Sequence, residues 1–391
     1  MKTLYVVSDN DRLKFIFEEF EEVELAIHLK KHEPEIECDA VILDGGLVHH
    51  QQLAEIREWY PNHPIFYKLG HVPSKAIMSN IRTVCEAYHI HLLSEYLDDS
   101  QIANDVIDSI FEREREAYPQ IISFFGTHSG AGVSTTVFSV AKMLSQRVQE
   151  KVVVLSLNPW DPSDYFLNYN GRYLNEIKLD LKMNALNEKK LIESVCYYEE
   201  EGFYHLAGNW DVKLQRYFKG EEIYQLIELA RRCFDVVLID AGTHYDNACS
   251  TQSYKSSELK FLVTTQEDKG YRCYWRHAFQ QMIEPLEGDS SNYMLIINRY
   301  MPGVSLINEK DMQKELDMSL LTTIPDQDIR AHLAINQKKL LADEGDNQYR
   351  KSIAVIINSI IARANLTKVE IEDDQKKGFL SKLFSRNKAA M

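Results

Sequence analysis

The stretch that decides the fold of this chain is Phe124-Phe125-Gly126-Thr127-His128-Ser129-Gly130-Ala131-Gly132-Val133-Ser134-Thr135-Thr136. It follows the apolar pair Ile121-Ile122 and precedes a helix-like segment from Val137 to Leu144. A glycine-rich turn between a strand and a helix is the setting in which backbone N–H groups close around phosphate oxygens. The stretch therefore predicts a phosphate-binding loop in an α/β domain, although such a turn can also be purely structural.

The loop lacks the lysine that usually supplies a positive charge to the phosphates. Val133 occupies the lysine position before Ser134-Thr135, while the glycines and hydroxyls remain. We expect phosphate to be held by backbone N–H groups, with the hydroxyl of Ser134 as a ligand of Mg²⁺.

The composition is that of a folded protein with room for two domains. The chain has 391 residues, of which 45% are hydrophobic and 26% charged. A net charge of -15 argues against nucleic acid as a partner, because such binding needs clustered Lys and Arg.

The cysteines and the apolar runs indicate a cytoplasmic protein that is soluble or peripheral to a membrane. The six cysteines are scattered without a CxxC pair, so neither a zinc site nor a disulfide framework is indicated. The first residues lack the apolar core of a signal peptide, and no run approaches the roughly 20 apolar residues of a membrane span.

Residues 1–116 predict one domain with a doubly wound parallel sheet, because short apolar runs alternate with helical periodicity. The expected strands are Thr3–Ser8, Ala40–Asp44, Ile65–Leu69 and His91–Leu93, and the expected helices are Asp11–Phe20, His49–Trp59, Ser74–Tyr88 and Ser100–Arg115. This order resembles a flavodoxin-like response-regulator receiver domain. Asp9 and Asp11 stand at its acidic cluster and Asp44 at its phosphoacceptor, but Ser94-Glu95 replaces its lysine. A structural or dimerising pseudo-receiver is therefore the default, and phosphorylation of Asp44 is the alternative.

A second α/β domain is predicted over residues 119–366. The charged run Glu112–Glu116 and Pro119 mark the boundary before it. The expected strands are Ile121–Phe125, Lys151–Leu157, Gly202–Leu206, Phe234–Ile239, Glu258–Thr264 and Asn292–Ile297. A last helix, Asn347–Ala364, carries isoleucines on one face and should pack on the sheet.

Three further motifs follow strands of this second domain. Asp240 ends an apolar strand and is expected to hold Mg²⁺ beside Ser134. Asn298-Arg299 ends a later strand, and Ile324-Pro325-Asp326 follows it. Together with the loop, these motifs resemble the MinD/ParA group of deviant-loop ATPases, which implies a parallel-sheet P-loop fold over about residues 120–365. With a receiver-like domain and a phosphate-binding loop that lacks its lysines, the chain looks most like the TadZ/CpaE family, which localises Flp/Tad pilus assembly.

The resemblance implies an ATP or ADP site with Mg²⁺ in a homodimer. Asn298 would contact adenine, and Pro325-Asp326 would lie against the base. The expected nucleotide contacts are Ser129, Gly130, Ala131, Gly132, Val133, Ser134, Thr135, Asn298, Arg299, Pro325 and Asp326, and the expected metal ligands are Ser134 and Asp240.

Two departures from that family bear on hydrolysis. His128 holds the place of an earlier lysine that normally reaches the partner's phosphates, and Ser156 and Asn158 replace the Asp-x-Asp pair tied to hydrolysis. Asp161 or Asp164 could compensate, although such residues more often form a turn or helix cap. Losing key cations removes much of the electrostatic stabilisation of phosphoryl transfer, so we expect binding with weak or absent turnover and name no catalytic residue.

Residues 367–391 form an acidic linker and a basic, apolar tail. On a helix, Phe379, Leu380, Leu383 and Phe384 share one face, and Lys382 is among the flanking cations. The tail looks like the membrane-targeting helix of MinD, which implies binding to an anionic membrane surface. The free energy of membrane binding is near zero for one tail, so two tails in a dimer would bind by avidity. The alternative is a helix that docks on the protein itself or on a partner.

We interpret the chain as a nucleotide-binding dimer that positions a pilus or secretion assembly at the inner face of the cell membrane. Whether it gathers at a cell pole is left open. Two alternatives remain. One is an active MinD/ParA-type ATPase that cycles between membrane and cytoplasm in spatial positioning. The other is a scaffold that no longer binds nucleotide.

Overall fold

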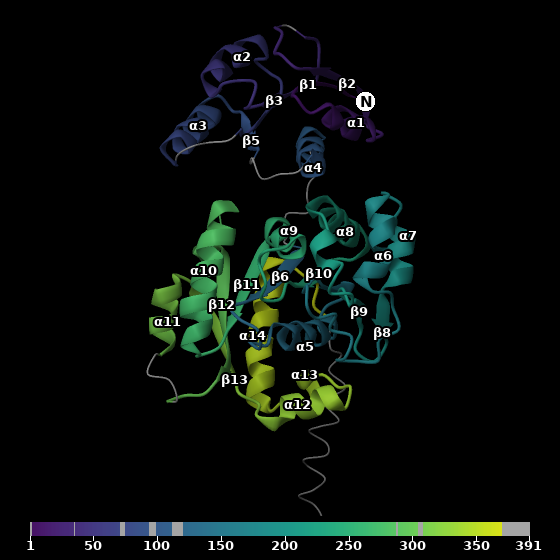
Figure 1. Ribbon diagram of the computed structural model, residues 1–391, viewed down its shortest axis with the longest axis vertical. Coiled ribbons are helices and arrows are strands. Elements are labelled where there is room, and N and C mark those ends of the chain that lie inside the picture. The colour runs from purple at the N-terminus through teal and green to yellow at the C-terminus, as the bar shows by residue number, and fades with distance from the viewer. Residues whose placement is uncertain are drawn as a thin grey trace, which may run out of the picture. The chain divides into compact units, whose positions relative to one another are not determined.

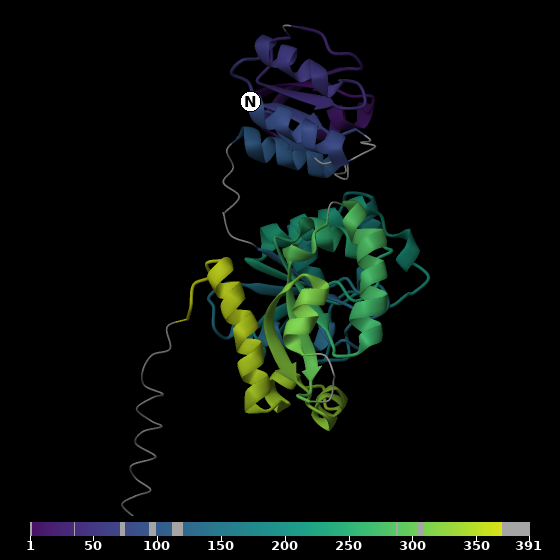
Figure 2. The same ribbon diagram turned by 90° about the vertical axis from the view of Figure 1, so that its left-hand side faces the viewer.

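The computed structural model describes residues 2–34, 36–70, 75–93, 99–111, 120–286, 288–303 and 308–369 (Figure 1 and Figure 2). The chain divides into two compact units, Met1–Ala117 and Tyr118–Met391. The boundary run Glu112–Glu116 and the tail from residue 370 lie outside the described residues. Among the described residues, no helix is long and apolar enough to cross a membrane.

The first unit contains a five-stranded parallel sheet in the order β2-β1-β3-β4-β5. This is the strand order of flavodoxin-like doubly wound sheets. Buried residues of α1 and α4 cover one face of the sheet, and those of α2 and α3 cover the other. The elements are β1 Lys2–Val7, α1 Asp11–Glu18, β2 Val23–Leu29, β3 Ala40–Asp44, η1 His50–Gln52, α2 Leu53–Trp59, β4 Ile65–Lys68, α3 Lys75–Ala87, β5 His91–Leu93 and α4 Asp99–Ile110. Strand β2 is an edge strand that the sequence analysis did not name.

Asp44 has hydrogen-bond partners of its own at the end of β3. Its Oδ1 accepts from the N–H of Gly46 at 2.8 Å, and its Oδ2 accepts from the hydroxyl of Ser8 at 3.2 Å. Asp11 pairs instead with Lys30, whose Nζ lies 3.4 Å from its carboxylate. No group of three His, Cys, Asp or Glu residues suited to a metal occurs in the described part of the chain. The receiver-like interpretation stays a prediction, and Ser94-Glu95 lies outside the described residues.

The second unit is built on an eight-stranded sheet in the order β13-β12-β11-β6-β10-β7-β9-β8. All neighbouring strands are parallel except β8 and β9. The strands are β6 Ile121–Gly126, β7 Val152–Ser156, β8 Cys196–Tyr198, β9 Phe203–Leu206, β10 Val236–Asp240, β11 Leu259–Thr264, β12 Tyr293–Tyr300 and β13 Ser319–Pro325. The six strands expected from the sequence are present with slightly different ends, and β8 and β13 are additional. Their continuous apolar runs fit strands that are covered on both faces.

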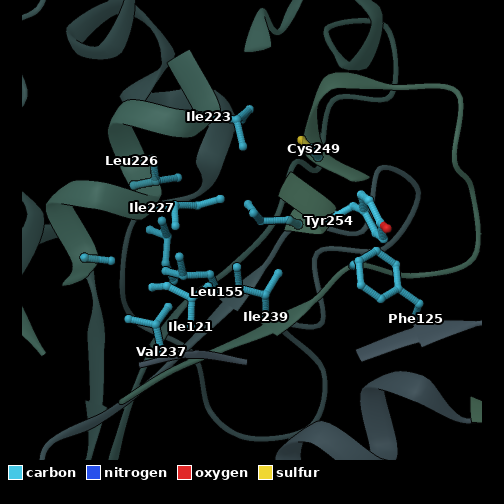
Figure 3. Close-up of a cluster of buried hydrophobic side chains, with 14 of the residues drawn as sticks. Ile121, Phe125, Leu155, Ile223, Leu226, Ile227, Val237, Ile239, Cys249 and Tyr254 are labelled. Atoms are coloured by element: carbon cyan, nitrogen blue, oxygen red, sulfur yellow. The ribbon is translucent and has the colours of Figure 1, made fainter. Parts of the chain in front are cut away.

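Helices cover both faces of this sheet (Figure 1 and Figure 2). One face packs against α5 Val133–Ser145, α12 Ile329–Asn336, α13 Leu341–Glu344 and α14 Asn347–Arg363. The other packs against α6 Leu174–Lys182, α7 Glu188–Ser194, α8 Gly220–Cys233, α9 Ala248–Ser256, a helical segment Lys269–Ile283 that includes α10 Arg276–Ala278, and α11 Glu309–Leu316. Short 3-10 helices are η2 Gln215–Tyr217, η5 Glu284–Leu286 and η6 Ser290–Asn292. Figure 3 shows side chains of β6, β7 and β10 meeting those of α8 and α9.

The isoleucines of α14 that were expected to face the core are buried. They pack with β6, β10 and α5 in one hydrophobic cluster. With this cover in place, the loops that follow the parallel strands meet at one edge of the sheet, where α/β proteins bind their ligands.

Candidate functional site

A cavity of about 730 Å³ lies at this edge, within the usual size range of ligand pockets. Loops after β6, β7, β10, β12 and β13 line it. Every residue that the sequence analysis named as a nucleotide contact lines this cavity: Ser129, Gly130, Ala131, Gly132, Val133, Ser134, Thr135, Asn298, Arg299, Pro325 and Asp326. The fold thus brings together residues that are about 200 positions apart in the sequence, and their role in binding stays a prediction.

The loop itself has the backbone that an anion site needs. Gly130 and Gly132 adopt left-handed conformations with φ of 87° and 89°, which side chains other than glycine rarely adopt. Gly132 is also the N-cap of α5, and no side chain caps that helix end. The first N–H groups of α5 are therefore available to a phosphate.

Asn298 packs directly on this loop. Its Nδ2 donates to the carbonyl of Ala131 at 2.8 Å, and the side chain is almost fully buried. A Cβ on Gly132 would collide with the same amide nitrogen. Asn298 therefore holds the loop as well as lining the cavity, a role that the sequence alone did not indicate.

Asp240 lies behind the loop and contacts it through a hydrogen bond with the hydroxyl of Ser134. Its carboxylate also accepts from the N–H of Gly242 at 3.1 Å and from the hydroxyl of Ser163 at 3.4 Å. Burial, to which the charge of Asp161 adds, raises the pKa of Asp240 to about 6. A buried carboxylate beside a hydroxyl at a phosphate loop fits the outer contacts of Mg²⁺, which prefers oxygen ligands and phosphate.

Neither of the two positions where the resemblance led us to look for lysine gives the loop a cation. Val133 is buried, and its Cγ2 lies 2.5 Å from where a Cβ on Gly126 would be. His128 is buried between two hydroxyls: Nδ1 lies 2.8 Å from Oγ1 of Thr127, and Nε2 lies 3.3 Å from Oγ1 of Thr265. Burial lowers the pKa of His128, so its ring is neutral near pH 7.

The charged side chains that line the cavity are mostly acidic. They are Asp161, Asp326, Asp328 and Arg299. Arg299 and Asp328 are also non-glycine residues with positive φ, at 51° and 50°, and such strain is frequent at ligand sites. A polyphosphate would meet net negative charge in this cavity unless a metal ion accompanied it.

The residues that replace the Asp-x-Asp pair point to different places. Ser156 is buried and hydrogen-bonds to Nε2 of His205 at 3.0 Å, whereas Asn158 lines the cavity and accepts from the N–H of Trp160 at 3.2 Å. Asp161 lines the cavity, but its carboxylate accepts from the N–H of Ser163 at 2.8 Å and the hydroxyl of Tyr165 at 2.7 Å. For Asp161 we considered two roles, a substitute for the missing carboxylate or part of a turn. These hydrogen bonds are those of a turn.

The other alternative carboxylate, Asp164, accepts from the hydroxyl of Tyr173 at 2.7 Å. That contact directs it toward the N-cap residue of α6. The two carboxylates considered as substitutes for the Asp-x-Asp pair, Asp161 and Asp164, are thus both engaged in other hydrogen bonds.

Several lining residues were not found from the sequence. They include Trp160, Gly242, Thr243, His244, Gln327, Asp328, His332 and Tyr349. Trp160, Gly242, Thr243 and His244 follow strands that the sequence did predict, so position after a parallel strand was the available signal for them. A second cavity of about 480 Å³ adjoins the first, and Ser129, Thr243 and His244 line both.

Two solved structures share the fold. A ParA family ATPase from Chlorobium tepidum TLS is 18% identical, with a TM-score of 0.53, over 61% of this chain and 99% of that chain. The septum site-determining protein MinD from Pyrococcus horikoshii OT3, complexed with Mg-ADP, is 16% identical, with a TM-score of 0.50, over 62% of this chain and 95% of that chain. Matches of this length must lie mostly in the second unit, because the first unit has only 117 residues. Comparisons with protein-family models and with curated proteins gave no match.

Proposed function

We propose that the second unit binds ATP or ADP together with Mg²⁺. The observation that carries the proposal is the cavity at the C-terminal edge of the sheet, where the uncapped N-terminus of α5, Ser134 with Asp240 behind it, and Asn298 converge. The MinD structure that shares this fold holds Mg-ADP, which supports the same ligand class here.

Each part of the ligand has a matching part of the cavity. The N–H groups of Gly132 to Thr135 would hold phosphate oxygens, and the hydroxyl of Ser134 would bind Mg²⁺ with Asp240 as its outer partner. Pro325 and Asp326 line the same cavity, and the resemblance to MinD/ParA proteins would place the base against them. With Nδ2 of Asn298 donating to the loop, its Oδ1 would accept from the amino group of adenine.

We further propose weak or absent hydrolysis. Phosphoryl transfer depends on cations that stabilise the transition state and on a group that positions water. Val133 and His128 supply no charge to the loop, and the carboxylate of Asp161 is engaged in a turn. The competing proposal is an active ATPase that cycles between membrane and cytoplasm, as the resemblance to MinD and ParA proteins would allow.

At the level of the cell, we propose a homodimer that positions a pilus or secretion assembly of the Flp/Tad type at the inner membrane. The ground for this is the resemblance of the sequence to the TadZ/CpaE family and the amphipathic tail around Leu383. The tail lies outside the described residues. A scaffold without nucleotide is the remaining alternative.

A pair of glycine variants tests the site. Gly132→Val should abolish nucleotide binding, because its side chain would collide with Asn298 and strain the loop. Gly130→Val is the matched comparison, since its φ is similarly strained but a Cβ there meets nothing within 4 Å. We expect a smaller loss of affinity than in Gly132→Val in isothermal titration with Mg-ATP, because only the collision with Asn298 differs. Equal affinity for the wild type and a folded Gly132→Val variant would reject the site.

A further inference from the structure

His244 lies on the loop that follows β10, four residues after Asp240. This loop is fixed to the start of the phosphate loop by two hydrogen bonds. The N–H of Gly126 donates to the carbonyl of Gly242 at 2.9 Å, and the hydroxyl of Tyr245 donates to the carbonyl of Gly126 at 2.9 Å. The methyl group of Thr243 also packs against Gly126. The position of His244 is thus set by the same residue that begins the glycine-rich turn.

The imidazole of His244 is held on the wall of the cavity. The backbone carbonyl of His244 accepts from Nδ2 of Asn247 at 2.8 Å and from the hydroxyl of Ser250. On the ring, Nδ1 lies 3.4 Å from Oγ1 of Thr243, and the ring centroid lies 5.7 Å from that of Trp160. With Nδ1 facing Thr243, Nε2 is the nitrogen that can donate to a ligand.

Three basic side chains line the cavity: Arg299, His332 and His244. Arg299 comes from β12 and His332 from α12, beside the residues expected to meet the base. His244 comes from the loop after β10, beside the expected Mg²⁺ partner Asp240. Since Mg²⁺ bridges the last two phosphates in P-loop proteins, a nucleotide with its Mg²⁺ beside Asp240 would have those phosphates on the His244 side of the cavity.

We propose that His244 donates a hydrogen bond from Nε2 to the γ-phosphate and so takes over part of the role of the missing lysines. The proposal rests on the proposed nucleotide site and adds to it a residue that distinguishes ATP from ADP. Burial lowers the pKa of His244, and Asp246 opposes that shift. A neutral imidazole still donates one N–H, so the interaction does not require protonation.

Titration of Mg-ATP and Mg-ADP into the full-length chain tests the role of His244. In His244→Ala, ATP affinity should fall roughly tenfold, the effect of one hydrogen bond to a charged group, while ADP affinity should change less than about twofold. In His244→Lys, a permanent cation should raise ATP affinity relative to ADP. His332→Ala is the matched control and should change both affinities by the same factor.

The outcomes separate the two proposals. If the wild type binds both nucleotides and His244→Ala leaves the ATP-to-ADP ratio unchanged, the role of His244 is wrong and the nucleotide site stands. If the wild type binds neither nucleotide, the proposed function itself is overturned and the role of His244 with it. Circular dichroism of each variant shows whether a lost affinity reflects a lost fold.

Discussion

The substitution Asp240→Asn should stabilise the protein without nucleotide, although it removes a residue of the proposed site. Asp240 is fully buried, and its pKa is raised from 3.8 to about 6. A carboxyl group whose pKa is raised on folding binds its proton more tightly in the folded state. Stability is therefore lost as the pH rises from about 4 to about 6, and the cost remains at neutral pH.

The size of this cost follows from the shift. About two pKa units correspond to roughly 3 kcal/mol at pH 7.5 in the absence of metal. Asparagine carries no charge and can keep the hydrogen bonds, because its oxygen can accept from the N–H of Gly242 and its nitrogen can donate to the hydroxyls of Ser134 or Ser163. We expect Asp240→Asn to raise the free energy of unfolding by about 1 to 3 kcal/mol.

Urea unfolding followed by tryptophan emission measures this effect, since Trp160, Trp210 and Trp275 lie in the second unit. The gain should be present at pH 7.5, about half as large at pH 5 and nearly absent at pH 4, where the carboxyl begins to be protonated in the unfolded chain as well. Asp235→Asn is the matched control, because Asp235 is an exposed residue just before β10 and should change stability by less than about 0.5 kcal/mol.

The same variant should lose the stabilisation that Mg-ATP gives to the wild type, because the outer partner of the metal is gone. A loss of stability at pH 7.5 in the nucleotide-free variant, or a gain of the same size at pH 4, would refute the reasoning from the buried charge.

Three further predictions concern turnover, the tail and pH. Val133→Lys combined with Asn158→Asp should raise ATP hydrolysis above the wild type in a phosphate-release assay, and wild-type turnover near 1 s⁻¹ or faster would contradict the argument from lost charge. Leu383→Glu should release the protein from anionic liposomes without affecting nucleotide binding, and cosedimentation equal to that of the wild type would assign the tail to a protein contact. Burial lowers the pKa of His205 from 6.5 to about 3, so stability should fall by about 3 kcal/mol between pH 7 and pH 4. A folded His205→Gln variant should not show these roughly 3 kcal/mol of acid destabilisation. If its free energy of unfolding depended on pH as that of the wild type does, the role of His205 would be wrong.

The sequence located the glycine-rich turn and the helix that follows it because their signals are local. The glycines at 130 and 132 are required by the backbone itself, and the neighbouring strands are continuous apolar runs. The edge of the sheet then follows from the rule that parallel strands place their carboxyl ends together. Asn298 and Pro325 were assigned to the same cavity as the loop by the resemblance to MinD/ParA proteins, and both line it in the structure.

The edge strands could not be predicted in the same way. Val23–Leu29 and Ser319–Pro325 lie at sheet edges, and in the latter only Ile324 is fully buried. Half-exposed strands lack the apolar run that marks central ones. Cys196–Tyr198 has only three residues, too few to show a period.

Within the site, the sequence could not show which side chains are already engaged. His128 stood at a lysine position, but only its burial between Thr127 and Thr265 shows that it gives the loop no charge. His244 belongs to no motif, and its place on the cavity wall depends on tertiary contacts of its loop with Gly126.

The central claim is that the cavity binds a nucleotide with its metal, and isothermal titration of ATP into the full-length protein in the presence of Mg²⁺ tests it most directly. The account predicts saturable binding with one nucleotide per chain. It also predicts that chelation of Mg²⁺ abolishes the binding, since the charged side chains that line the cavity are mostly acidic. Absence of binding heat, together with absence of nucleotide carried through purification, would contradict the claim.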